Sequence, residues 1–249
     1  MFKDKSLAAV QHFKGDHRFI SARASLREKE EKETFAVGHF ALGYLLGKSA
    51  SQVTRTKMNI PLVLTLSVIP DIDILIPYVE HRGPFHSIIM AAIIFIPIFA
   101  LYRKSALPYF IALIQHPLIG DYIADGQVQL LWPITSQTFG IEISIRSLTN
   151  ITLEWLTFIA AAVVMVKTKD THALLQPKSS NLILAIPTFT VLLPTFLAFP
   201  LSVPTALIPP HIICLTLFLT SILIDIKKIV KQKSSSVKNQ PTNNKLKRQ

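Results

Sequence analysis

Histidine and aspartate residues that could bind a metal ion are concentrated in the first half of this 249-residue chain. They fall in or beside its first apolar segments, and they are His39, Asp71, Asp73, His81, His86, His116, Asp121 and Asp125. Imidazole and carboxylate together form a ligand set that suits Zn²⁺, Mn²⁺ or Fe²⁺ better than Cu(I). Because an ionisable group costs about 2.5–3.5 kcal/mol at the centre of a membrane helix, such a concentration predicts a functional site.

The composition is that of a membrane protein. Half of the residues are hydrophobic, 16% are charged and the mean hydropathy is +0.42, whereas soluble domains carry about 25% charged residues. The formal charge is +11, with eight basic residues before Phe35 and eight after Asp225. A single cysteine, Cys214, excludes a disulfide scaffold. We therefore predict a multi-pass integral protein of the cell membrane.

The apolar segments predict an all-α polytopic membrane helix bundle with six or seven transmembrane helices. Spanning the membrane takes about 20 helical residues, and the candidate spans are 34–54, 58–79, 86–102, 107–124, 150–167, 181–202 and 204–225. Pro209-Pro210 interrupts the last of these, so one of the final two segments could be re-entrant.

Charged tails flank this membrane domain, which is expected over residues 34–226. Residues 1–33 form a charged N-terminal tail, and residues 227–249 form a basic tail that lacks acidic residues and is expected to be disordered. The basic tail could contact anionic lipid headgroups. No aromatic residue lies between its lysines, so no nucleic-acid partner is expected.

Topology brings the candidate residues to one membrane boundary. In an up-and-down bundle, the starts of odd-numbered helices and the ends of even-numbered helices share one face. The residues at those positions are His39, Asp71, Asp73, His81, His86 and Asp121. The orientation stays open, because seven spans place 10 basic residues on that side against 16, whereas six spans place 18 against 8.

A helix break is expected just before the paired carboxylates. Asp71 and Asp73 are two residues apart, about 200° around a regular helix, so both cannot face one metal ion from such a helix. Pro70 removes a backbone donor and disfavours the helical conformation at Ile69. A break at Ile69 would place both carboxylates at a helix start, where they can turn inward.

Five motifs in order over about residues 36–135 resemble one known family. They are Gly38-His39, Pro70-Asp71-Ile72-Asp73, His81-Arg82-Gly83-Pro84-Phe85-His86-Ser87, His116 with Asp121, and Val128-Gln129-Leu130-Leu131-Trp132-Pro133. In this order they resemble the membrane-bound metal-dependent hydrolases of the YdjM family, inner-membrane proteins of which some bacterial members are LexA-regulated. That family is in turn distantly similar to zinc-dependent phospholipases C and P1-type nucleases.

The chain departs from the family pattern at two positions. The threonine before the second histidine is Phe85 here, and His116 and Asp121 are five residues apart instead of four. A spacing of five rotates two side chains about 140° apart on a regular helix. Both residues therefore join one site only if Pro117 distorts the helix, and Asp125 is the substitute if it does not.

The residues and the resemblance together predict metal-assisted hydrolysis. The expected ligands of one or two divalent ions, Zn²⁺ first and Mn²⁺ or Fe²⁺ next, are His39, Asp71, Asp73, His86, His116 and Asp121. Catalytic roles are expected for Asp73, for His81 in proton transfer, and for Arg82, which could clamp a phosphate oxygen. Membrane lipids are the expected partners, and the substrate would be a phosphoester, a lipid headgroup included.

Two other functions fit the same residues. An ion or proton transporter would use the histidines and aspartates as a relay, although transporter sites tend to lie near the middle of the bilayer. A non-catalytic scaffold would use a closed metal site to tie helices together and would unfold on chelation. The sequence leaves open the substrate, the metal and its nuclearity, the orientation and the oligomeric state.

Overall fold

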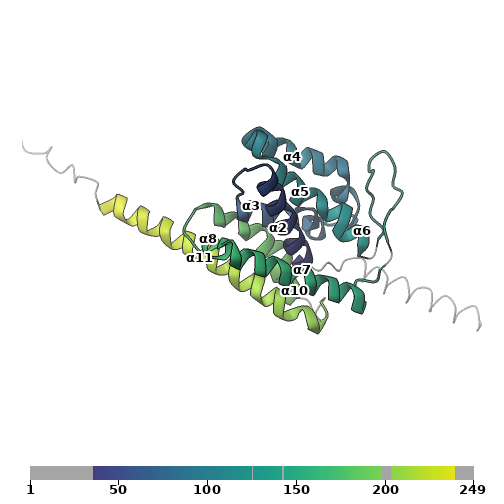
Figure 1. The fold of residues 1–249 in the computed structure, drawn as a ribbon. Coiled ribbons are helices and arrows are strands. Elements are labelled where there is room, and N and C mark those ends of the chain that lie inside the picture. Colours follow the sequence, from purple (N-terminus) through teal and green to yellow (C-terminus); the bar gives the residue numbers. More distant parts are fainter. Residues whose placement is uncertain (1–35, 125, 142, 198–202, 239–249) are drawn as a thin grey trace, which may run out of the picture. The chain divides into compact units, whose positions relative to one another are not determined.

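The computed structural model describes residues 36–124, 126–141, 143–197 and 203–238, and these residues are helical or irregular (Figure 1). The helices of the first half are α2 (Ala36–Val53), α3 (Ile60–Leu66), η1 (Ile69–Leu75), η2 (Pro84–His86), α4 (Ile88–Tyr102), η3 (Arg103–Ser105), α5 (Leu107–Gln115), η4 (His116–Gly120) and α6 (Asp121–Ile123). Those of the second half are α7 (Leu148–Lys167), α8 (Asp170–Leu174), η5 (Ser180–Leu184), α9 (Ala185–Pro187), η6 (Thr188–Leu192), α10 (Leu193–Leu197), η7 (Thr205–Leu207) and α11 (Ile208–Lys238). Within the described residues the only β pairing is two isolated bridges, so the all-α prediction is confirmed.

Four helical segments are long and apolar enough to cross a membrane. They are Ile88–Ser105, Leu148–Lys167, Ser180–Leu197 and Thr205–Ser235, and they correspond to the third, fifth, sixth and seventh predicted spans. The prediction of an integral membrane protein is supported by these helices. The longest, α11, continues to Lys238, past the boundary at residue 227 where we expected a disordered tail, because its lysines and glutamine are compatible with a helix.

The three other predicted spans, 34–54, 58–79 and 107–124, are not among these segments of the described chain. The 18-residue helix α2 is largely buried inside the protein. Helices α3 and α5 have seven and nine residues and pass into short distorted helices that contain Pro70 and Pro117. The segments that carry the polar residues thus face protein more than lipid, and a count of six or seven spans stays a prediction.

Helix α2 lies at the centre of the described fold. It contacts α3, α5, α7 and α11 (Figure 1). Small residues allow these contacts, because a side chain at Gly43 would overlap Ser67, and one at Gly47 would come within 3.1 Å of Val63. On another face of α2, Phe40 packs edge-on against Phe218 of α11 with ring centroids 5.1 Å apart. Helix α2 therefore carries His39 into the interior of the protein.

An ion pair holds the second half of α2 against the turn that follows α7. Oδ2 of Asp170 accepts hydrogen bonds from Nζ of Lys48 at 2.5 Å and from the hydroxyl of Tyr44 at 2.7 Å. Burial by itself raises the pKa of Asp170, but the hydrogen bonds from Lys48, Tyr44 and Thr168 outweigh burial and lower this pKa. The ionised form of Asp170 therefore stabilises the fold.

We expect Asp170→Asn to lower the free energy of unfolding at pH 7 by about 1–2 kcal/mol, because Lys48 is left partly buried without its countercharge. A carboxylate with a lowered pKa stabilises the fold above its unfolded pKa of about 3.9 and loses that contribution as the pH falls through its folded value. Thermal unfolding in detergent, followed by circular dichroism, should thus show a gap between parent and variant that narrows from pH 7 to pH 3.5. Lys167→Gln is the control, and an equal gap at both pH values would contradict the prediction.

Candidate metal centre

Four buried side-chain atoms from four segments of the chain converge on one point. Nε2 of His116 lies 3.1 Å from Oδ1 of Asp71, 3.2 Å from Oδ2 of Asp121 and 3.2 Å from Nε2 of His86. Nε2 of His86 lies 3.4 Å from Oδ1 of Asp71 and 3.2 Å from Oδ2 of Asp121. Ligands 2.0–2.1 Å from a tetrahedral Zn²⁺ ion are about 3.3–3.4 Å apart. Five of the six atom pairs in this cluster are therefore spaced like ligands of one zinc ion.

The break at Pro70 places the two carboxylates on either side of one imidazole. Helix α3 ends at Leu66, and the 3₁₀ helix η1 begins at Ile69 with Pro70 in its first turn, as the sequence predicts. Oδ1 of Asp71 then faces Nε2 of His86, whereas Oδ2 of Asp73 lies 3.1 Å from Nδ1 of the same ring. Because the two nitrogens point in different directions, Asp73 lies behind His86 as seen from the four-atom cluster.

A π-helical turn resolves the five-residue spacing between His116 and Asp121. Residues His116–Gly120 form this turn, and the backbone N–H of Asp121 donates to the carbonyl oxygen of His116. In a π turn, residues five apart lie above one another, so both side chains face the cluster. The predicted distortion at Pro117 is present, and both His116 and Asp121 belong to the cluster. Asp125, the proposed substitute, falls outside the described residues.

Outer contacts fix which ring nitrogens face the cluster. Nδ1 of His116 donates to the carbonyl oxygen of Ser67 at 2.8 Å, which leaves Nε2 to face the carboxylates. Asp73 lies 2.9 Å from Nδ1 of His81 through its other oxygen, Oδ1. Histidine ligands of metals usually make such a contact through the second ring nitrogen. The carbonyl of Ser67 has no signature in the sequence, and sequence reasoning missed it.

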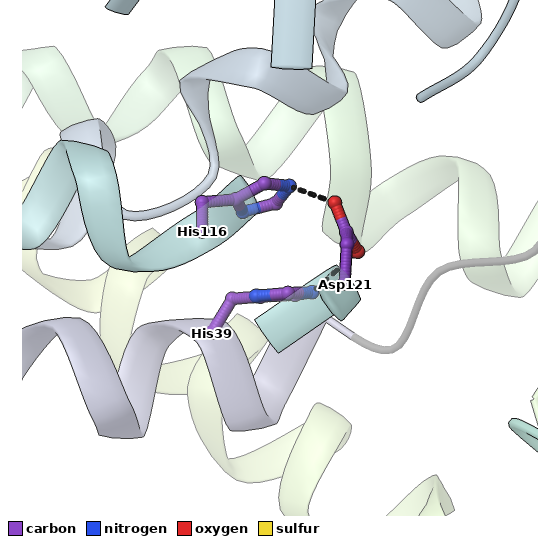
Figure 2. Close-up of side chains that lie close together, drawn as sticks. All are labelled: His39, His116 and Asp121. Carbon is purple, nitrogen blue, oxygen red and sulfur yellow. Dashed lines mark ion pairs between the residues drawn. The ribbon is translucent and has the colours of Figure 1, made fainter. Parts of the chain in front are cut away.

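His39 joins the cluster through its contacts with His116 and Asp121 (Figure 2). Its ring stacks on that of His116 with centroids 4.0 Å apart, and its Nε2 lies 3.5 Å from Oδ1 of Asp121. Gly120 makes this approach possible, because a side chain there would overlap the imidazole of His39. The amide of Gln115, a second residue that the sequence did not single out, donates to the carbonyl oxygens of His39 and Ser67.

The loop between α6 and α7 packs against the turn that carries His81 and Arg82. The backbone N–H of Gln129 donates to the carbonyl oxygen of Arg82 at 3.0 Å, and the N–H of Ile88 donates to that of Leu130 at 3.0 Å. Arg82 itself is buried, has a φ of 63° and places Nε 3.9 Å from Oδ1 of Asp121. The loop therefore covers this side of the site.

The residues present fit a divalent cation. Three groups have ligand atoms within 4.8 Å of one another, namely His39 with His116 and Asp121, Asp71 with His86 and His116, and Asp73 with His81 and His86. They contain all six predicted ligands and His81. Both carboxylate oxygens of Asp121 are buried without a well-formed hydrogen bond within the described residues. Because a buried carboxylate without donors is costly, a cation would stabilise this arrangement.

Comparison with known proteins gives one family. The family described as "YdjM inner membrane protein" matches residues 35–203, more than half of the chain. No curated protein and no solved structure matches. The match covers every residue of the cluster, and the distant likeness to phospholipases C and P1-type nucleases stays a prediction.

We expect Gly120→Ala to weaken Zn²⁺ binding about tenfold, because the added methyl group displaces His39 and changes of this kind around a metal ligand cost 10–100-fold in affinity. Gly120 has a φ of −57°, so alanine fits the backbone and the effect should arise at His39. Titration of the purified protein with Zn²⁺ against a competing chelator measures the affinity. Ile119→Ala, one residue earlier in the same turn, is the matched control, and equal affinities for the two variants would contradict the prediction.

Proposed function

The chain belongs to the YdjM inner membrane protein family, and from this premise we propose that it is a membrane-embedded, metal-dependent hydrolase. The substrate class would be a phosphoester, lipid headgroups included, reached at one membrane boundary. The observation that carries the proposal is the four-atom cluster of His86, His116, Asp71 and Asp121, in which the two imidazole nitrogens lie 3.2 Å apart and each is 3.1–3.4 Å from both carboxylate oxygens. Zn²⁺ is the ion we propose, because imidazole nitrogens and carboxylate oxygens are ligands that it commonly takes.

The helices around the cluster support its proposed location near one membrane boundary. His86 lies two residues before Ile88, where the first candidate span begins. Glu154, near the start of the second candidate span, accepts a hydrogen bond at 2.6 Å from the N–H of Gly38, next to His39. We further propose that α2 and the segments around α3 and α5 complete a bundle of six or seven crossings, with the cluster near one face.

Each polar residue has a distinct role in this proposal. A divalent ion held by the cluster would lower the pKa of a bound water towards ~7 and polarise the bond under attack. His81 is held through Nδ1 by Asp73 at 2.9 Å, and its buried Nε2 has no hydrogen-bond partner within the described residues. That nitrogen is positioned to give a proton to the leaving group or to take one from water. Asp73 thus acts by orienting the two histidines that it contacts, His81 and His86.

The position of Arg82 supports the proposal that the substrate is anionic. Its guanidinium group is always charged and presents a planar fork of donors that matches two oxygens of a phosphate. It lies beside the carboxylate of Asp121, 3.9 Å away, and the backbone of the covering loop holds its carbonyl oxygen. A substrate phosphate near the ion would therefore meet a second positive charge.

A non-catalytic scaffold is the second candidate, and the same cluster favours it. Four protein ligands in a closed tetrahedron are typical of structural zinc sites, whereas catalytic sites keep one position open for water. His39 is relevant to the choice between an enzyme and a scaffold, because its Nε2 lies 3.5 Å from Oδ1 of Asp121, the oxygen outside the four-atom cluster. If Asp121 binds His39 in place of the ion, one coordination position of the ion becomes open for water. Chelation separates the two functions, because removal of the ion unfolds a scaffold and leaves an enzyme folded and inactive.

We expect the protein purified in detergent to hold one or two equivalents of zinc and to lose them in Asp71→Ala and His86→Ala, since each removes a cluster ligand. Elemental analysis by inductively coupled plasma mass spectrometry gives the metal content. His172→Ala, outside the cluster in α8, is the control. Full metal content in both cluster variants would refute the assignment. A metal-free parent that takes up no added ion and supports ion flux in proteoliposomes would favour the transporter.

We expect Arg82→Lys to keep the metal content of the parent and His81→Gln to keep the ion of the four-atom cluster. Both variants should reduce hydrolysis of a phosphodiester by about 10²-fold or more, the usual contribution of a positioned acid or base. Hydrolysis of bis(p-nitrophenyl) phosphate and release of headgroups from phospholipid vesicles would be followed with each protein. Gln176→Ala serves as the control. Hydrolysis at the parent rate in both variants would remove these residues from the mechanism.

A further inference from the structure

An apolar cavity of about 240 Å³ lies on the far side of α2 from His39. Its walls come from α2, α7 and α11, with contributions from Leu64 of α3 and Thr171 of α8. Its lining is hydrophobic apart from the hydroxyl groups of Tyr44 and Thr171. Val37 and Phe40 line it, and they point more than about 90° away from His39 around the helix. The cavity is therefore separate from the metal centre and shares only helix α2 with it.

The cavity lies between helices that could cross a membrane. Two of its walls, α7 and α11, are candidate membrane spans. Val166 of α7 and Ile213 of α11 line the cavity and are also 67% and 53% exposed, so they mark its outer edge. Water needs two to four polar partners to occupy a cavity, and this lining offers few. The available apolar occupant is a lipid chain from the bilayer.

The two ends of the cavity differ in their polar surroundings. Near Val37, the carboxylate of Glu154 lies 2.6 Å from the N–H of Gly38. At the other end, the lining residues Val166 and Thr171 bracket the turn that holds Lys167 and Lys169, both exposed. An anionic headgroup is attracted at the second end, because lysines near a membrane surface favour anionic lipids.

We propose that this cavity binds one acyl chain of an anionic phospholipid, with the phosphate near Lys167 and Lys169. From Tyr44 to Val37 the lining follows α2 for about 10 Å, two thirds of the ~15 Å depth of one leaflet. The headgroup would lie at the C-terminal end of α7, whereas Glu154 and the metal centre lie towards its N-terminal end. The bound lipid is therefore a ligand in the other leaflet and not the substrate of the metal centre. The proposal does not depend on the proposed hydrolase.

Photolabelling of the full chain tests the site. The protein is reconstituted into phosphatidylethanolamine and phosphatidylglycerol vesicles that contain a trace of phosphatidylglycerol with a diazirine in one acyl chain. After irradiation, peptide mass spectrometry locates the adducts. We expect adducts on inner lining residues such as Ala41, Cys214 and Phe218, which are 4%, 9% and 2% exposed. Adducts confined to outward residues such as Leu153 and Ile212 would overturn the proposal.

Successive alanines of α7 provide a matched pair of variants. Ala161 lines the cavity and is 5% exposed, whereas Ala160 is exposed and is not part of the lining. We expect Ala161→Phe to abolish labelling of Cys214, because its ring fills the cavity, and Ala160→Phe to leave it unchanged. Equal labelling in both variants would refute the site, and Ala162→Leu repeats the test with a smaller side chain if Ala161→Phe does not fold.

The headgroup preference is tested separately. The double variant Lys167→Gln, Lys169→Asn removes both charges, and asparagine tolerates the φ of 60° at residue 169. We expect the parent to be labelled more strongly by phosphatidylglycerol than by phosphatidylcholine with the same diazirine chain, and the double variant to lose this preference. A parent without such a preference would overturn the anionic part of the proposal. The metal content of each variant, measured in parallel, separates failure here from failure of the proposed hydrolase.

Discussion

The burial of Asp71 and Asp121 against the same two imidazoles is the constraint on which the rest of this structure depends. Both carboxylates are almost completely shielded from solvent, and both lie within 3.4 Å of the imidazoles of His86 and His116. Two negative charges removed from water in this way are tolerated only with compensating positive charge. A divalent ion bound between them would supply this charge.

The departures from regular helix follow from that constraint. The 3₁₀ helix at Ile69 turns Asp71 and Asp73 towards His86, and the π turn at His116 turns Asp121 towards the same ring. Each distortion weakens the helix in which it occurs, which is why α3 and α5 are short. Rare helical forms of this kind are often found at functional sites. The regular helix is interrupted at Ile69 and at His116, and these interruptions bring the polar side chains together.

Helix α2 connects the two sites that we infer. One face carries His39 to the metal centre, and its glycines let neighbouring helices approach closely. The opposite face lines an apolar cavity between two membrane-spanning candidates. Since α2 is largely buried, a displacement of this helix by a lipid chain would move His39 as well. The same packing that shields the carboxylates therefore places a lipid-facing cavity one helix away.

The sequence by itself determined the all-α membrane class, the break at Pro70 and the set of histidines and aspartates that meet, because composition, proline geometry and the order of helices are local or additive properties. It did not determine that Asp73 lies behind His86, that a π turn aligns His116 with Asp121, or that α2 is an interior helix. Those features depend on contacts between distant segments: the carbonyl of Ser67 on His116, and Gly120 against His39. Backbone carbonyls and absent side chains leave no pattern along a sequence, and only the packed structure decides where they lie.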